Sequence, residues 1–275
     1  MIKRALILSV VIAVSIPMLY TITGKPLPFN VFISGSDDYV SFPDMAAALK
    51  YARKTAPSFI YHWDSGRLLW DNSVSHPPAV MLKIPLLYQM PELPRGCEVT
   101  SLAMLLLHEG IKTDKLELAK RIKKDSTPYQ IKNGRIFYGN PNEGFVGKMD
   151  SFNVAGYGVY HGPIAALLDE YMPGMALDLT GCEFNDLLYY LVLKIPVWVI
   201  INITYAPLPQ SAFLTWDTAD GLIRITYREH SVLLTGYDET YIYFNDPLKG
   251  KYAAERDKFA AAWEQMGRQA VTYMP

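Results

Sequence analysis

Residues 89–110, QMPELPRGCEVTSLAMLLLHEG, contain the feature on which the prediction of the fold depends: a cysteine at the start of an apolar helix. A turn rich in proline precedes Cys97, and Gly110 ends the predicted helix. Backbone amides and the helix dipole at a helix N-terminus stabilise a thiolate, so Cys97 is a candidate nucleophile. Glu98 beside it opposes that effect. The alternative is that Cys97 is a small buried hydrophobic residue, as most free cysteines are.

A second stretch offers a base for this thiol. Residues 230–250, HSVLLTGYDETYIYFNDPLKG, have the pattern of two antiparallel strands joined by a short polar turn. Pairing Tyr237 with Tyr241 places Asp246 diagonally adjacent to His230 on the same face of the sheet. A carboxylate in that position holds an imidazole in the tautomer that accepts a proton from a thiol.

The register of this hairpin determines which residue meets the histidine. A two-residue turn would slip the pairing by one position and bring Asn245 to the side of His230 in place of Asp246. Both carboxylate and amide orienters are used in thiol hydrolases, so either register is chemically workable.

Gln89 is a candidate donor to an oxyanion. It precedes Cys97 on a strand-like segment, and its side-chain amide could act together with the backbone amide of Cys97. Glutamine is a common surface residue, so a solvated side chain is the alternative.

The two motifs, in this order, resemble the papain-like cysteine peptidases of the bacteriocin-processing (double-glycine leader) family, especially its stand-alone exported members. The likeness covers about residues 80–275. It implies an α+β papain-like fold with Cys97 as nucleophile, His230 as general base and acid, Asp246 as orienter and Gln89 at the oxyanion hole. It also favours the register that pairs Asp246 with the histidine.

Two departures limit what the resemblance carries over. Transporter-linked members place the glutamine closer to the cysteine and follow the cysteine with small residues, whereas here Cys97 is followed by Glu98. A Gly-x-x-x-x-Gly-Lys loop that would hold nucleotide phosphates is missing from the sequence, so an exporter is excluded. Cleavage after a double glycine is therefore not carried over to this chain.

The order of elements also predicts an α+β architecture. Helices come first and carry the nucleophile, and antiparallel strands come last and carry the histidine and aspartate, without βαβ alternation. We expect a linker over residues 25–40, which are rich in Pro, Gly, Ser and Asp. We expect a small helix-plus-hairpin unit over residues 41–79 and the peptidase domain over residues 80–275.

Residues 1–24 have the pattern of a membrane anchor or signal segment. Lys3 and Arg4 precede an apolar run from Ala5 to about Ile22 that is long enough to span a bilayer. With the basic pair on the cytoplasmic side, the rest of the chain would be extracytoplasmic, or secreted if the segment is cleaved.

Composition excludes several classes of protein. Lys and Arg number 26 against 27 Asp and Glu, for a formal charge of -1, so a nucleic-acid partner is not expected. Two cysteines, Cys97 and Cys182, do not make a disulfide scaffold, and the five histidines lack metal-ligand spacing. We therefore expect no cofactor and no metal. Cys182 and His108 are expected to be structural, and a packed residue is the first interpretation of His161.

The sequence thus predicts hydrolysis of a peptide or amide bond outside the cytoplasm, on a peptide or protein substrate. Two alternatives stay open. One is a papain-like binding or scaffold module without turnover, which would hold cell-wall peptide or a membrane partner. The other is acyl transfer by the same triad, which differs in whether water or an amine reaches the acyl-enzyme.

Overall fold

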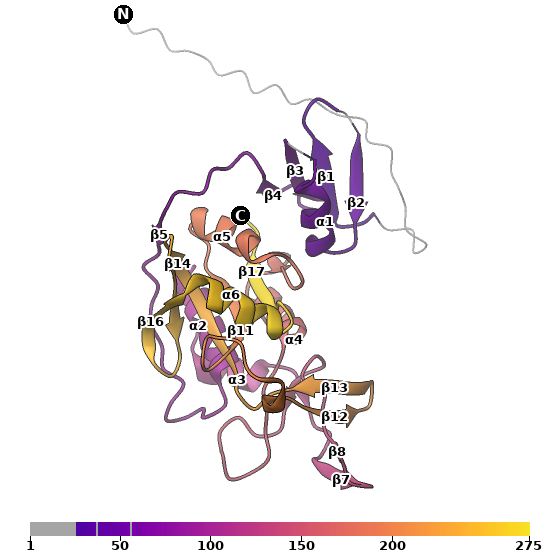
Figure 1. Cartoon of the computed structure of the whole chain (residues 1–275), viewed down its shortest axis with the longest axis vertical. Helices are drawn as coiled ribbons and strands as arrows, with labels where there is room; N and C mark the ends of the chain where they lie inside the picture. The colour runs from indigo at the N-terminus through magenta and orange to yellow at the C-terminus, as the bar shows by residue number, and fades with distance from the viewer. Residues whose placement is uncertain (1–25, 37, 56) are drawn as a thin grey trace, which may run out of the picture.

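The structure, a computed structural model, describes residues 26–36, 38–55 and 57–275 (Figure 1). The predicted anchor or signal segment, residues 1–24, lies outside this part of the chain. Within the described ranges, no helix combines the length and the apolar character needed to cross a membrane.

The first unit is a four-stranded antiparallel sheet covered by one helix, drawn in indigo in Figure 1. The strand order is β2-β1-β3-β4, and α1 packs against β1 and β3. Asp44 caps α1 by accepting a hydrogen bond from the amide of Ala47 at 2.8 Å. The elements are β1 (Phe29–Ile33), β2 (Tyr39–Phe42), α1 (Met45–Ala52), β3 (Ser58–His62) and β4 (Leu68–Asp71).

The prediction of a linker over residues 25–40 is wrong, because β1 and the beginning of β2 lie within it. β1 pairs with β2 on one side and with β3 on the other, and the side chain of Val31 is fully buried. One of its two partners, β3, lies later in the sequence than this range, and the Pro, Gly, Ser and Asp content of the range concealed the pairing with both.

The larger unit is built on a seven-stranded sheet in the order β10-β17-β11-β14-β15-β16, with β5 added to β14. Every pairing within it is antiparallel, as the sequence predicted. β11 is buried along its whole length because it lies inside the sheet. The strands are β5 (Val80–Met81), β10 (Ala176–Asp178), β11 (Val197–Asn202), β14 (Glu229–Tyr237), β15 (Tyr241–Asp246), β16 (Gly250–Glu255) and β17 (Ala270–Tyr273).

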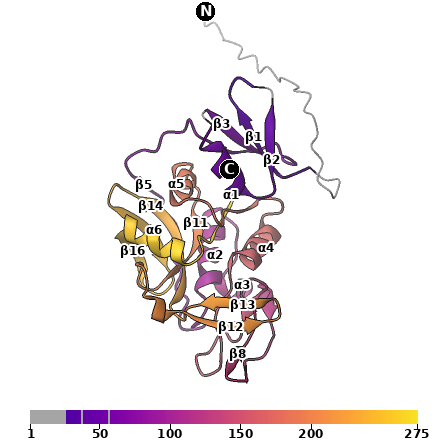
Figure 2. The ribbon, with the colours of Figure 1, turned by 45° about the vertical axis from the view of Figure 1, so that its right-hand side comes forward.

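Helices cover both faces of this sheet (Figures 1 and 2). The indole of Trp198 on β11 donates to the carbonyl of Glu98 in α2, whereas Phe244 on β15 stacks against Phe259 of α6. α2 is buried from its first residue through Leu106, so it forms the core of the unit. The helices are α2 (Cys97–His108), α3 (Lys115–Arg121), α4 (His161–Tyr171), α5 (Phe184–Val192), the short 3-10 helix η1 (Gln210–Ala212) and α6 (Arg256–Gln265).

The two units are joined by contacts at α5. Arg53, directly after α1, pairs with Asp186 and, at 2.9 Å, with Glu183. The ring of Trp70 on β4 packs against Tyr189, with centroids 6.2 Å apart. The first unit is therefore packed against the larger one.

Short strands occupy the loop-rich region between α3 and α4 and the segment after β11. β7 (Gln130–Lys132), β8 (Arg135–Phe137), β12 (Leu214–Thr218) and β13 (Gly221–Ile225) form a separate sheet, and β6 (Lys124–Asp125) pairs with β9 (Phe145–Val146).

At its turn, the β14–β15 hairpin differs from the predicted register. Tyr237 pairs with Ile242, and the amide of Asp238 donates to the carbonyl of Tyr241 at 2.9 Å. The predicted pairing of Tyr237 with Tyr241 is therefore wrong, and the turn has two central residues.

A β-bulge then corrects the slip before the strands reach the candidate site. The pairing shifts between Leu234 and Gly236, and beyond it Leu233 pairs with Asn245. That pair also belongs to the predicted register. The bulge therefore gives this end of the hairpin the side-chain orientation that the sequence predicted.

Candidate active site

Cys97 is the first residue of α2 and is nearly buried, with 7% of its surface exposed. The turn before it is closed by a hydrogen bond from the amide of Gly96 to the carbonyl of Leu93 at 3.0 Å. A Cβ on residue 96 would lie 2.5 Å from the Cβ of Leu93, so only glycine fits there. This tight turn fixes where the thiol enters the structure.

His230 and Asp246 meet as the sequence predicted. The Nε2 atom of His230 lies 3.0 Å from Oδ1 of Asp246, off the line of an ideal hydrogen bond, and both side chains are buried. Asn245 points to the other face, where its amide donates to the carbonyl of Pro85 at 3.1 Å. The aspartate, and not the asparagine, therefore contacts the imidazole.

The carboxylate of Asp246 has several donors besides this contact. Its Oδ1 accepts from the amides of Leu248 at 2.6 Å and Lys249 at 3.0 Å, and its Oδ2 accepts from the hydroxyl of Tyr205. Burial alone would raise the pKa of Asp246, but His230, Tyr205 and the Leu248 amide lower it to about 2. Sequence reasoning missed Tyr205, since nothing in its neighbourhood marks a contact with a distant hairpin.

The thiol of Cys97 lies at the edge of β14. The amide of Ser231 faces the sulfur, and the carbonyl of Ser231 accepts from the hydroxyl of Ser101 at 3.2 Å. Ser231 directly follows His230 in the chain. The two candidate catalytic residues are thus brought to neighbouring positions of α2 and β14.

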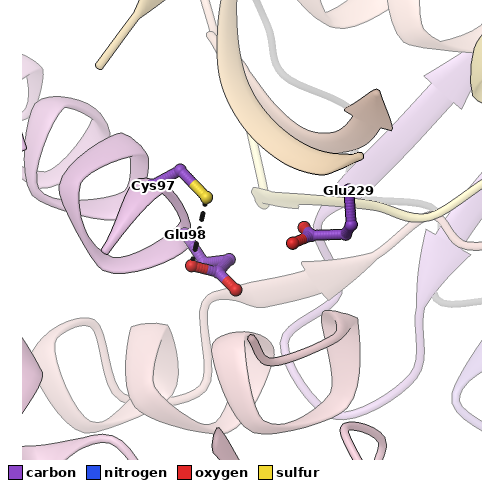
Figure 3. Close-up of side chains that lie close together, drawn as sticks. All are labelled: Cys97, Glu98 and Glu229. Atoms are coloured by element: carbon purple, nitrogen blue, oxygen red, sulfur yellow. Dashed lines mark hydrogen bonds between the residues drawn. The ribbon is translucent and has the colours of Figure 1, made fainter. Parts of the chain in front are cut away.

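No hydrogen bond joins the thiol to the imidazole. The sulfur instead donates to Oε2 of Glu98 at 3.3 Å, and the carboxylate of Glu229 points toward the same place (Figure 3). Burial and the charges of Glu98 and Glu229 raise the pKa of the Cys97 thiol well above its ordinary value, against a smaller opposite effect of the Ser231 amide. The resting thiol is therefore protonated, and it needs a base to become a nucleophile.

Glu98 and Glu229 form a buried acidic pair. Burial raises the pKa of Glu98 to about 7, although its Oε1 accepts a hydrogen bond from the amide of Val159 at 2.8 Å. Burial and the neighbouring Glu98 raise the pKa of Glu229 well above its ordinary value. Sequence reasoning weighed Glu98 only as a neighbour of the cysteine and did not consider Glu229. The available signal was position, since each glutamate adjoins a candidate catalytic residue.

Gln89 lies in the same loop, but its amide is directed elsewhere. Its Nε2 donates to the carbonyls of Leu93 at 3.2 Å and Pro94 at 2.8 Å, while its Oε1 is buried without a partner. Both N–H bonds thus hold the turn before Cys97. The role at an oxyanion hole stays a prediction, and this hydrogen bonding does not support it.

The remaining candidates are held in structural contacts. His161 pairs with Asp178 at 2.6 Å, and Nε2 of His108 contacts the carbonyl of Lys194 at 3.2 Å. Cys182 is buried, and burial raises the pKa of its thiol well above the ordinary value.

A groove of about 760 Å³ lies beside the turn that leads to Cys97. Glu92 and Leu93 of that turn line one part of it, and Phe145 lines another. Tyr157 and Tyr160, which could also have lined a groove, are buried, and their hydroxyls are 2.8 Å apart. The groove is a candidate path for an extended substrate.

Comparison with known proteins identifies the family. Residues 81–271 match the model of the Peptidase_C39 like family. The uncharacterized protein YvpB of Bacillus subtilis (strain 168) is 43% identical over 190 residues, which are 68% of this chain and 73% of that protein. A crystal structure of a Bacillus anthracis protein titled as a C39-like peptidase is 46% identical, covers 72% of this chain and 98% of its own, and has a TM-score of 0.68. This α+β chain with a papain-like fold therefore belongs to the Peptidase_C39 like family.

Proposed function

We propose that this chain is a cysteine peptidase that hydrolyses peptide or amide bonds, with Cys97 as nucleophile, His230 as general base and acid, and Asp246 as the residue that orients the imidazole. The observation that carries the proposal is the buried contact of His230 with Asp246 at 3.0 Å, together with the approach of the amide of Ser231, the residue after His230, to the sulfur of Cys97. Membership in a peptidase family supports the same assignment.

The contact with Asp246 involves Nε2 of His230, so a neutral imidazole with its proton on Nε2 has Nδ1 free to act as base. In the proposed reaction the thiol leaves Glu98, and Nδ1 of His230 takes its proton. The sulfur attacks the carbonyl carbon, and the imidazolium then gives the proton to the leaving amine. Water, deprotonated by the same nitrogen, hydrolyses the thioester, which releases the acid and restores the thiol.

Two features would assist the substrate. The groove beside the turn of Leu93 offers room for an extended peptide. The backbone amide of Cys97, at the N-terminus of α2, is an available donor to the oxyanion of the tetrahedral intermediate. We place the reaction outside the cytoplasm, on the basic and apolar pattern of residues 1–24, with the chain anchored in the membrane or secreted after cleavage.

A thiol-directed acylating probe on the full-length protein tests the proposal, with intact mass as the readout. We expect the probe to acylate Cys97, and the rate to fall about 10³-fold or more in His230→Ala, because the thiol would lose its base. Cys182→Ala is the matched control and should label like the unmodified protein. Equal labelling rates with and without His230, or labelling confined to Cys182, would overturn the assignment.

One observation favours a second candidate, a papain-like binding module without turnover. The thiol is protonated and hydrogen-bonded to Glu98, not to the imidazole. On this alternative, Cys97 would react slowly and at the same rate in His230→Ala. The probe experiment therefore separates the two functions.

A further inference from the structure

The proposed mechanism gives no role to the two buried glutamates beside Cys97. Cys97 and Glu98 from the start of α2 meet Glu229 from the start of β14, and the ligand-type atoms of the three lie within 4.8 Å of one another (Figure 3). Within the described part of the chain, this is the group of at least three His, Cys, Asp or Glu side chains that is spaced to hold a metal ion. A thiol and two carboxylates together are a donor set suited to zinc.

One carboxylate oxygen of Glu229 has no partner in this group. The residue keeps some exposure as a whole, but its Oε1 is sealed from solvent and has no hydrogen-bond partner. Figure 3 shows its carboxylate aimed at Cys97 and Glu98. A buried carboxylate oxygen is normally hydrogen-bonded, paired with a cation or bound to a metal.

The backbone above the group approaches it closely. A Cβ on residue 158 would lie 2.3 Å from Oε1 of Glu98 and 3.0 Å from Oε2 of Glu229. Gly158 therefore lets the chain close over both carboxylates, while the next amide, that of Val159, donates to Glu98. A small ion is a ligand that fits between three acidic side chains whose ligand atoms lie this close together.

We propose that Cys97, Glu98 and Glu229 bind one Zn²⁺ ion, which holds the nucleophile in an inactive state. Zinc takes thiolate at about 2.3 Å and carboxylate oxygen at about 2.0–2.2 Å in a tetrahedral arrangement, with a water molecule completing the four ligands. Binding releases the thiol proton and the proton held by the two glutamates to solvent, and it forms one Zn–S bond and two Zn–O bonds. The bond to zinc withdraws charge from the sulfur, which makes it a poorer nucleophile until the metal is removed.

His230 is not part of this ligand set. Its Nε2 is turned toward Asp246, which is itself held by Tyr205 and two amides. The proposed zinc site and the His230–Asp246 pair therefore have no side chain in common. A change at His230 should therefore leave zinc binding intact, whereas a change at Glu229 should weaken it.

The test is zinc titration of the metal-free full-length protein against a chromogenic chelator, followed by Co²⁺ substitution to detect the near-ultraviolet absorption of a cobalt–thiolate bond. We expect one ion per chain. We expect affinity to fall at least 100-fold in Glu229→Gln and in Cys97→Ser, because each removes one of three protein ligands. His230→Gln should bind zinc like the unmodified protein, although the proposed peptidase reaction would be lost. Glu143→Gln, which removes an exposed carboxylate, and Cys182→Ser are the matched controls.

Thermal unfolding of each variant separates loss of the ligand from loss of the fold. The proposal would be overturned if Glu229→Gln bound zinc as tightly as the unmodified protein. It would also be overturned if His230→Gln abolished binding, which would indicate a cysteine–histidine site, or if the protein bound no zinc because Glu98 and Glu229 share a proton instead. Metal binding is read without substrate, so this result is independent of whether the chain is a peptidase.

Discussion

Two buried carboxylate environments flank β14, and they differ in what surrounds the charge. Asp246 accepts from two backbone amides and a tyrosine hydroxyl and contacts His230, and its pKa is lowered to about 2. Glu98 accepts from its own amide, the Val159 amide and the Cys97 thiol, and its pKa is raised to about 7. One oxygen of Glu229 has no partner, and burial and the neighbouring Glu98 raise the pKa of this residue well above its ordinary value.

The comparison shows that burial does not by itself set the state of a carboxyl group. Burial raises the pKa in both environments, and the number of donors then determines the outcome. At neutral pH, Asp246 is ionised and held in place by its donors. The glutamates keep a proton close to the nucleophile unless a cation takes its place.

Removing the well-compensated carboxylate should have the largest effect. Asp246→Ala takes away the partner of His230 and leaves the hydroxyl of Tyr205 without its acceptor. We expect the rate of acylation of Cys97 to fall about 10³-fold, since a misoriented imidazole is a poor base. Asp246→Asn should lose less, because its amide oxygen can still accept. Peptide or probe kinetics measure both variants, and an alanine variant as fast as the unmodified protein would contradict the orienting role.

Neutralising the poorly compensated carboxylate, Glu98, should increase the stability of the fold above neutral pH. A folded-state pKa of about 7 for Glu98, raised from 4.5, means that the folded protein loses stability as pH rises from about 4.5 through 7. Glu98→Gln should therefore stabilise the metal-free protein at pH 8 by about 2–3 kcal/mol and have little effect at pH 4.5. Its amide oxygen can still accept from Val159.

Urea unfolding at the two pH values, with chelator present, measures this difference. Glu143→Gln serves as the control, since its carboxylate is exposed and pairs with Lys123 at the surface. A gain in stability that is the same at both pH values would contradict the explanation.

Weakening the compensation of Asp246 should have the smallest effect. Tyr205→Phe removes one donor to Asp246 and leaves the amides of Leu248 and Lys249 in place. We expect the free energy of unfolding at pH 7 to fall by about 1 kcal/mol. A depressed pKa stabilises the fold above about 3.8, and the contribution is lost as pH falls toward 2, so acid unfolding should begin at higher pH in the variant. An unchanged acid midpoint, followed by circular dichroism, would show that the hydroxyl does not support the carboxylate.

Local patterns predicted much of this site. Proline, glycine and apolar periodicity marked the helix that begins at Cys97. Strand alternation left Asp246 and Asn245 as alternatives on the face of His230, and the family resemblance favoured Asp246, which is the residue in contact. These features depend on residues within one helix or one hairpin, which the sequence shows directly.

Contacts between distant segments were not predictable in this way. Glu98 meets Glu229 only because α2 packs against β14, and Tyr205 reaches Asp246 from a turn after β11. β1 was assigned to a linker for the same reason, because its partner β3 comes later in the chain. The bulge was not predicted either, although Gly236, an isolated glycine inside β14, is a residue that could have marked it.

The bulge between Leu234 and Gly236 allows the strand register at the hairpin tip to differ from the register at the end that carries His230 and Asp246. A change in length within Asp238–Tyr241 would alter only the pairs between tip and bulge. A deletion between the bulge and His230 would turn His230 to the other face of the sheet, the face of Asn245 and away from Asp246. The tip is accordingly a place where an epitope or fluorescent insertion should be tolerated, whereas the spacing from the bulge to His230 must be kept.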